Sequence, residues 1–285
     1  MTTPGPALTP QDEKALQALI AWWADAGIEM DAPVMAARPA ASAAANPAPP
    51  TQNRRQTSEE PVRAATPQAA RAAGFGDSTA TGPGALTLAG RANTLDELKL
   101  AIGAFDGCAL KRTARNTVFA RGNPAARIMI VGDAPGRDED ERGEPFAGQT
   151  GQLADRMMAA IGLERDDAYM TCMLNWRPPG MRAPTQDEIA LCLPFAERHI
   201  ALKQPDFLLL AGGQCAQALL RTDTPITRLR GQWTEYQVRG KDGTPTGTSI
   251  PTMPIFHPGY LLRRPSEKRL AWQDLLALSA RLAGH

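Results

Sequence analysis

Carboxylate side chains and one aromatic ring gather in a glycine-rich stretch near the middle of the chain. An apolar run at 127–131 is followed by the turn Gly132–Gly136 (GDAPG), the acidic run 137–140 and the segment Glu144–Gly148. Glycine and proline relieve the steric limits of a tight turn, while the neighbouring carboxylates and backbone N–H groups stay available to a ligand. The pattern favours an active-site turn after a strand, although an acidic, glycine-rich turn is also an ordinary solvated loop.

Two more loops carry residues that could bind a substrate. Trp176–Arg182 contains an Arg-Pro-Pro sequence, and His257–Arg263 (HPGYLLR) follows the apolar run 251–256. A single histidine after a strand is more often a structural hydrogen-bond partner than a catalyst, so His257 gains weight only beside the other loops. Ligands of parallel α/β sheets bind at the carboxyl ends of the strands. We therefore expect these loops, which are distant in sequence, to meet at one rim.

The segments between the loops alternate between strand and helix. Thr94–Glu97 and Thr185–Glu188 are Thr-x-x-Glu capping boxes, which mark helix starts. The run 206–211 is almost wholly apolar, as expected of a strand covered on both faces. This alternation predicts an α/β fold, a three-layer α/β/α sandwich with a mainly parallel central sheet. The predicted strands are 127–131, 168–174, 206–211, 232–238 and 252–256. The predicted helices that follow the helix starting at Thr94 are 150–161, 186–203, 213–221 and 266–282.

Composition divides the chain into three parts. We expect residues 1–32 to hold an amphipathic helix, residues 33–91 to be a disordered linker rich in Ala and Pro, and residues 92–285 to form the folded domain. The tandem Trp22 and Trp23 favour a protein partner for the helix, and folding back onto the domain is the alternative.

Overall composition sets limits on compartment and cofactor. The 285 residues are 43% hydrophobic, and the net charge of +1 gives no sign of a polyanionic partner, although it can hide a local basic face. The amino terminus lacks the pattern of a signal peptide, and no apolar run reaches the roughly 18 residues of a spanning helix, so we expect a cytoplasmic protein with no membrane partner. The four cysteines are widely spaced without a Cys-x-x-Cys pair, which argues against a disulfide framework and common zinc sites.

Taken together, these motifs resemble the uracil-DNA glycosylase superfamily, and its family 4 in particular. The resemblance spans residues 94–282, with the motifs in the same order and at similar spacing. It rests on the segments Gly132–Gly136, Pro145–Gly148, Arg177–Pro179, Arg230–Trp233 and His257–Arg263.

The resemblance implies hydrolysis of the N-glycosidic bond of a deaminated base that has been flipped out of DNA, with no metal in the chemical step. Phe146 matches the family's ring that stacks on the base, and His257 matches the histidine that donates to the base carbonyl as negative charge builds there. Asp133 and Glu139 match acidic positions where a carboxylate orients water and stabilises the cationic sugar. The N–H of Ala134 would help to hold the base.

The expected macromolecular partner is DNA, either single-stranded or a damaged duplex, bound by a monomer. Basic side chains in the rim loops would contact phosphates, which makes affinity fall with salt. The candidates are Arg177, Arg182, Arg230 and Arg263.

This chain departs from the family at the positions of an iron–sulfur cluster, which needs four thiolates in family 4. The matching positions are Phe105, Cys108, Trp176 and Cys192, so two cysteines are replaced by large rings. We expect no cofactor, with the rings of Phe105 and Trp176 filling the space that a cluster would occupy. A bound 4Fe–4S cluster is the alternative. The other two cysteines are not at ligand positions.

A second departure concerns recognition of the base. The family carries an asparagine that reads the uracil edge, and Cys172 stands at that position here. A thiol cannot reproduce the paired hydrogen bonds of an amide, and losing a buried polar pair costs about 1–3 kcal/mol. We therefore expect weak uracil excision or a shifted base preference. The alternative function is a catalytically weakened DNA-binding or damage-sensing module on the same fold.

Overall fold

The computed structural model describes residue 20 and residues 84–284. The predicted amino-terminal helix in residues 1–32, apart from Ile20, and residues 33–83 of the predicted linker lie outside this part. The last residues of the predicted linker are not a linker, because Ala85–Arg91 form helix α2. Ala85 and Ala89 are buried as α2 packs against helix α7 (Gln186–Lys203). The small alanines resemble low-complexity sequence, but at helical spacing they allow close packing of two helices.

The centre of the domain is a six-stranded sheet in the order β1-β3-β2-β4-β6-β5. The neighbours β3, β2, β4 and β6 run parallel, and β1 and β5 are antiparallel at the two edges. The predicted mainly parallel sheet is therefore confirmed. The strands are β1 (Ala120–Gly122), β2 (Ile128–Gly132), β3 (Ala168–Cys172), β4 (Phe207–Ala211), β5 (Thr234–Arg239) and β6 (Pro245–Ile255).

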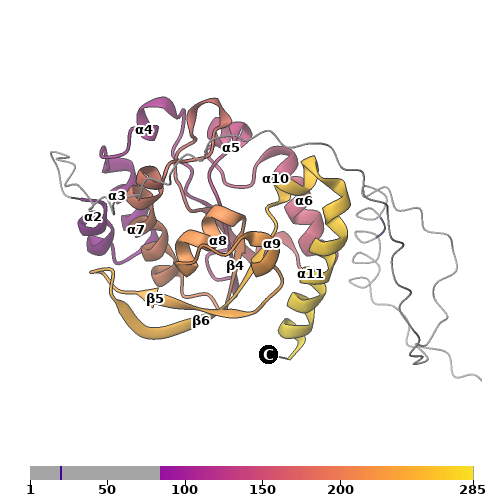
Figure 1. Cartoon of the computed structure of the whole chain (residues 1–285). Coiled ribbons are helices and arrows are strands. Elements are labelled where there is room, and N and C mark those ends of the chain that lie inside the picture. Colours follow the sequence, from indigo (N-terminus) through magenta and orange to yellow (C-terminus); the bar gives the residue numbers. More distant parts are fainter. Residues whose placement is uncertain (1–19, 21–83, 285) are drawn as a thin grey trace, which may run out of the picture. The chain divides into compact units, whose positions relative to one another are not determined.

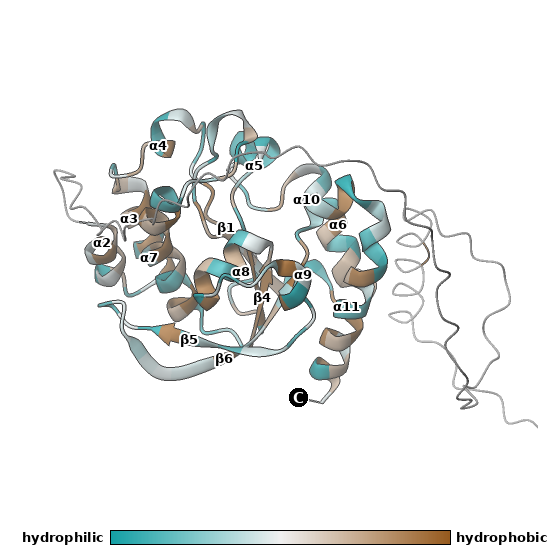
Figure 2. Ribbon diagram, in the orientation of Figure 1, coloured by the Kyte–Doolittle hydropathy of each residue, from teal (hydrophilic) through white to brown (hydrophobic). Residues whose placement is uncertain are grey.

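Helices cover both faces of the sheet, which confirms the three-layer sandwich (Figure 1). Residues of β2 alternate between the layers. Met129 and Val131 join the cluster with α7 and with helices α3 (Leu95–Ala104) and α8 (Gly213–Leu220). Ile128 and Ile130 join the cluster with helices α6 (Gly148–Ala159) and α11 (Lys268–Ala283). All five residues of β4 are buried, and Figure 2 colours this strand as hydrophobic. Continuous burial is what a parallel strand between two helical layers requires.

The longer helices agree with the capping boxes and apolar periodicity of the sequence. Thr94 caps α3 and Thr185 caps α7, each by accepting a hydrogen bond from the backbone N–H three residues later. Among the described residues, no helix combines the length and the hydropathy that a membrane crossing would need. These helices are α3 (Leu95–Ala104), α6 (Gly148–Ala159), α7 (Gln186–Lys203), α8 (Gly213–Leu220) and α11 (Lys268–Ala283).

Short elements and strand edges differ most from the sequence prediction. The predicted rim loops contain short helices, and β6 begins at Pro245, seven residues before the predicted strand start at 252. Such edges carry few buried side chains, so their hydrophobic pattern is weak: the first five residues of β6 are exposed. The short helices are α4 (Leu110–Thr113), α5 (Arg137–Arg142), α9 (Ile226–Leu229) and α10 (Pro258–Arg263).

Candidate functional site

A cavity of about 610 Å³ opens at the carboxyl end of the parallel strands. Its walls come from the turn after β2, the Pro-rich loop before α7, the start of α8 and the segment after β6, so the predicted convergence of loops is observed. Another cavity, of about 510 Å³ between the end of α7 and the β5–β6 hairpin, contains none of the predicted catalytic or base-binding residues. The first is therefore the candidate active site. Predicted residues that line it are Asp133, Ala134, Glu139, Arg182, His257 and Arg263.

His257 lies at the start of helix α10 and is held in one orientation. Its Nδ1 accepts a hydrogen bond from the backbone N–H of Gly259 at 3.1 Å. Burial, aided by the charge of Arg263, lowers the pKa of His257 to about 4. The ring is therefore neutral at physiological pH, and because Nδ1 is an acceptor, its proton sits on Nε2. His257 is a neutral hydrogen-bond donor at the cavity.

The carboxylate of Asp133 lies over the amino terminus of helix α8. One oxygen accepts a hydrogen bond from the backbone N–H of Cys215 at 2.7 Å. Gly212 makes this approach possible, because a Cβ there would lie only 2.1 Å from the other carboxylate oxygen. Burial nevertheless raises the pKa of Asp133 to about 6, against the lowering effect of the α8 amides. This acid titrates close to neutrality.

Glu139 uses its carboxylate mainly to organise its own turn. It accepts a hydrogen bond from the N–H of Gly136 at 3.0 Å, and the N–H of Ala147 also interacts with it. Burial raises its pKa. Glu139 lines the cavity, but these contacts tie the GDAPG turn to the segment that carries Phe146, so its first role is structural.

Phe146 is buried, and its ring stacks against His257 with centroids 5.6 Å apart at 20°. Gly132 leaves room for this contact, since a Cβ on it would lie 3.0 Å from the Phe146 ring and 3.4 Å from Nε2 of His257. Phe146 itself does not line the cavity. In this structure the Phe146 ring packs against His257, and its predicted stacking on the base stays a prediction.

Cys172 ends β3 in register with Gly132 and is also buried below the cavity. Burial and the nearby Asp133 and Glu139 raise the pKa of its thiol well above the ordinary value, so the thiol is neutral. Asn175 cannot supply the missing amide, because its Nδ2 donates to the carbonyl of Val118 at 2.9 Å. Cys172 is not among the residues that line the cavity, so its predicted contact with the base stays a prediction.

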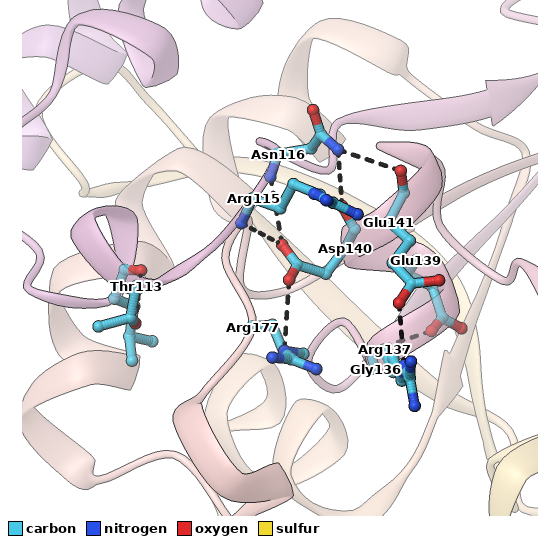
Figure 3. Close-up of polar contacts among 10 residues, drawn as sticks. Thr113, Arg115, Asn116, Gly136, Arg137, Glu139, Asp140, Glu141 and Arg177 are labelled. Carbon is cyan, nitrogen blue, oxygen red and sulfur yellow. Dashed lines mark hydrogen bonds and ion pairs between the residues drawn. The ribbon is translucent and has the colours of Figure 1, made fainter.

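Sequence reasoning missed Asp140, a buried acid that joins three segments (Figure 3). Its carboxylate accepts from the backbone N–H groups of Arg115 at 2.7 Å and Asn116 at 3.2 Å. Its other oxygen lies 3.3 Å from Nε of Arg177. From the sequence, an acid within a run of charged residues is expected to be solvated, so the linking role of Asp140 is visible only in the fold.

The predicted DNA-binding arginines have different environments. Arg177 faces Asp140 with a 26% exposed side chain, and Arg182 is 42% exposed while both of its terminal nitrogens bond to Glu188. Arg182 and the exposed Arg263 both lie on the cavity wall.

Arg230 does not fit the predicted contact with phosphate. Its side chain is 13% exposed and forms two hydrogen bonds with Asp274, at 3.0 and 2.5 Å, and another with the carbonyl of Leu270. The guanidinium also lies 5.4 Å from the ring centroid of Phe256, the residue before His257. Its contacts instead anchor α11 next to Phe256, the residue that precedes His257.

Comparison with known proteins agrees with this geometry. The model of the family described as the uracil DNA glycosylase superfamily matches residues 119–276. The type-4 uracil-DNA glycosylase of Archaeoglobus fulgidus is 36% identical over 176 residues, which cover 60% of this chain and 85% of that protein. This chain belongs to the uracil DNA glycosylase superfamily. The glycosylase of Thermotoga maritima is 33% identical over 59% of this chain and 84% of its own length.

This chain also resembles part of a much longer protein. A DNA polymerase of Bacillus phage SP01 is 28% identical over 176 residues, which make up 61% of this chain and 18% of the polymerase. The likeness therefore covers a small part of the polymerase only.

The four positions that match cluster ligands in this superfamily do not fit an iron–sulfur cluster. Phe105 stacks on Trp176 with centroids 6.4 Å apart and packs edge-on against Phe195 at 5.2 Å. Cys108 and Cys192 are fully buried, and a hydrogen bond from the Cys192 thiol lowers the pKa of Cys108. In the described part of the chain, no three His, Cys, Asp or Glu side chains group to hold a metal ion. Two thiols between packed rings offer half of the required ligands.

We expect Arg230→Ala to destabilise the protein and to weaken the anchoring of His257. Removing one partner from a buried ion pair costs about 3–5 kcal/mol, because Asp274 is left buried without its counter-ion. Urea-induced unfolding measures this loss. The matched control is Arg228→Ala, since Arg228 is exposed in the same segment and should change the free energy of unfolding by no more than about 0.5 kcal/mol. Equal stability of the two variants would contradict the anchoring role.

Proposed function

We propose that this chain is a DNA-repair glycosylase that hydrolyses the N-glycosidic bond of uracil, or of a related deaminated base, after the base has left the DNA stack. The relatives named type-4 uracil-DNA glycosylases support the reaction class. The observation that carries the proposal is the neutral His257, oriented by Gly259 and carrying its proton on Nε2 at the cavity that also contains Asp133.

The chemistry requires charge stabilisation on both fragments of the breaking bond. As the bond to the sugar lengthens, negative charge builds on the base carbonyl and positive charge on the sugar ring. His257 would donate from Nε2 to the carbonyl oxygen. A fixed neutral donor suits this task because it needs no reorganisation when charge develops.

Asp133 would act on the sugar side of the bond. Its ionised carboxylate would stabilise the cationic ring and orient the attacking water, while the α8 amides hold the group in place. The N–H of Ala134 would bind the base from the same turn. The proposed role of Glu139 is to hold this turn, with a lesser electrostatic contribution, because backbone N–H groups occupy its carboxylate.

Base recognition is the weakest part of the proposed site. Cys172 offers neither the strong donor nor the strong acceptor of an amide. The chain would therefore excise uracil slowly or prefer another deaminated base. The second candidate function, a DNA-binding or damage-sensing module with weakened chemistry, is favoured by the same residue.

We further propose that the domain folds and acts without an iron–sulfur cluster. The rings of Phe105, Trp176 and Phe195 provide contacts between segments that a cluster would otherwise cross-link. Trp176 is also fixed by a hydrogen bond from its indole N–H to Thr117 at 3.1 Å.

An excision assay tests the reaction and its base preference. Oligonucleotides that contain uracil, hypoxanthine or xanthine are incubated with protein and then cleaved at abasic sites with alkali. We expect wild-type cleavage of at least one substrate, and a loss of about 100-fold or more in His257→Ala, since one donor to the developing anion is removed.

In the same assay we expect Cys172→Asn to raise uracil excision by about tenfold, because an amide restores a hydrogen-bonding pair worth about 1–3 kcal/mol. Cys172→Ser is the matched control, since it removes the thiol without supplying an amide edge. No cleavage of any base by wild type or Cys172→Asn would favour the binding module.

The pH dependence of excision tests the role of Asp133. Because its pKa is near 6, the active ionised form accumulates as pH rises, so kcat/KM should increase through pH 6 and level off above about pH 7. His257 is protonated only near pH 4 and adds no change between pH 5 and 8. Asp133→Asn should lower the plateau and remove the acidic limb. A limb that persists in this variant would exclude Asp133 as its source.

Iron content tests the cluster-free proposal. Anaerobically purified wild-type protein should contain no stoichiometric iron or acid-labile sulfide and no broad violet-blue absorption. Full excision activity at that metal content supports the proposal. Near-stoichiometric iron and sulfide, with activity that follows them, would overturn it.

A further inference from the structure

Cys108 and Cys192 form a pair of thiols that the proposed reaction does not use. Both side chains are fully buried and belong to the same apolar core cluster. Their sulfur atoms are in hydrogen-bond contact, although the two residues are far apart in sequence. Neither thiol lines the active-site cavity. The chemistry of this pair is therefore separate from that of Asp133 and His257.

The pair lies between two different parts of the fold. Cys108 is in the connection between α3 and α4, and Cys192 is on α7. The Lys111 ammonium bonds to the Gly103 carbonyl and the Asp106 carboxylate, both at 2.6 Å and both in the same stretch of chain as Cys108. The contact between the two thiols, in contrast, links this connection directly to α7.

The surroundings of Cys108 favour its ionised form. The thiol of Cys192 bonds to its sulfur, and so do the backbone N–H groups of Leu110 and Lys111 in the first turn of α4. These donors lower the pKa of Cys108 to about 7, against the opposing effect of burial. The bond to Cys108 and burial raise the pKa of Cys192. Because the thiolate is the nucleophilic form of cysteine, Cys108 is the first of the two to react with an oxidant.

We propose that Cys108 and Cys192 form a reversible disulfide on exposure to hydrogen peroxide, and that this bond locks the α3–α4 connection onto α7. The inference rests on the proposed cluster-free domain, since both thiols would otherwise bind iron. It does not depend on the excision reaction, and it gives the two remaining cysteines of the altered site a function of their own.

The environment of the pair selects a small oxidant. Neither thiol is exposed, whereas Asp106 and Ala109, close to Cys108 in the chain, lie at the surface. Local opening of this short connection admits a molecule of about the size of water. The rings of Phe105 and Trp176, which stack in the same core cluster, exclude bulky disulfides. Hydrogen peroxide meets this requirement.

The reaction takes two steps and consumes one peroxide. The Cys108 thiolate attacks one oxygen, the O–O bond breaks, and the sulfur becomes a sulfenic acid, while the departing hydroxide takes up a proton and forms water. The Cys192 sulfur then attacks the sulfenic sulfur, an S–S bond forms, and hydroxide leaves with the Cys192 proton as a second water. The two thiols thus lose two electrons and two protons to the peroxide. A dithiol reductant reverses the bond.

Thiol mapping tests the bond directly. The full-length reduced protein is titrated with hydrogen peroxide, up to the concentration that oxidises the exposed Met181 to its sulfoxide. Samples are denatured and alkylated, and their proteolytic peptides are analysed by mass spectrometry. We expect a linked peptide that joins Cys108 to Cys192, while the other two cysteines are recovered as alkylated thiols. Absence of this peptide over the whole titration would overturn the proposal.

Thermal unfolding tests the locking role. A cross-link across a long loop lowers the entropy of the unfolded chain, so oxidation should raise the Tm of the wild type by about 5 °C or more, and dithiothreitol should reverse the rise. Cys192→Ser should show no rise. The matched control Cys215→Ser removes another fully buried thiol and should respond as the wild type does. The comparison of oxidised with reduced wild type requires neither variant to fold. A linked peptide without a rise in Tm would overturn the lock.

Iron content of the same samples separates this inference from the proposals on which the domain's function rests. Failure to form the bond in iron-free protein would refute the disulfide alone. Near-stoichiometric iron would refute the cluster-free domain and the disulfide with it. Neither measurement needs DNA, so a protein that excises no base would refute the proposed reaction while the disulfide is still tested.

Discussion

The close meeting of β2, Phe146 and His257 is the constraint on which the site depends. Gly132 carries no side chain, so the Phe146 ring and Nε2 of His257 can both approach the end of β2. The histidine is thereby placed against a buried ring that excludes water, which keeps it neutral. A side chain at Gly132 would require the neighbouring rings to shift by a few tenths of an ångström, because a Cβ there would lie 3.0 Å from Phe146 and 3.4 Å from Nε2 of His257.

Neighbouring carboxylates have different roles because their hydrogen-bond partners differ. Asp133 bonds to the amino terminus of α8, Glu139 to its own turn, and Asp140 to the backbone of Arg115 and Asn116. Burial raises the pKa of Asp133 to about 6, which is the property expected of a group that must be ionised yet lie in a desolvated cavity. Asp140, in contrast, links the Arg-Pro-Pro loop to α5 through Arg177 and so fixes the relation between two walls.

Three residues carry the two features in which this chain is expected to differ from its relatives: Phe105 and Trp176 at the predicted cluster positions, and Cys172 at the end of β3. Rings at Phe105 and Trp176 turn a potential metal site into hydrophobic packing, and dispersion contacts replace coordination bonds there. In the proposed function, Cys172 offers the base only a weak thiol contact. Asn175 does not supply an amide in its place, because its Nδ2 donates to the carbonyl of Val118.

Apolar periodicity and Thr-x-x-Glu boxes predicted the layers, the parallel core strands and the capped helices, because these patterns act over short distances in the sequence. The motifs also placed Asp133 and His257 at one rim. The roles of Arg230 and Asp140 became visible only in the folded chain, since their partners, Asp274 and Arg177, are far away in sequence. The helix α2, the edge strand β1 and the long β6 likewise depend on neighbours. Charged residues look alike along a chain, and the fold alone determines which are buried against a partner and which face a substrate.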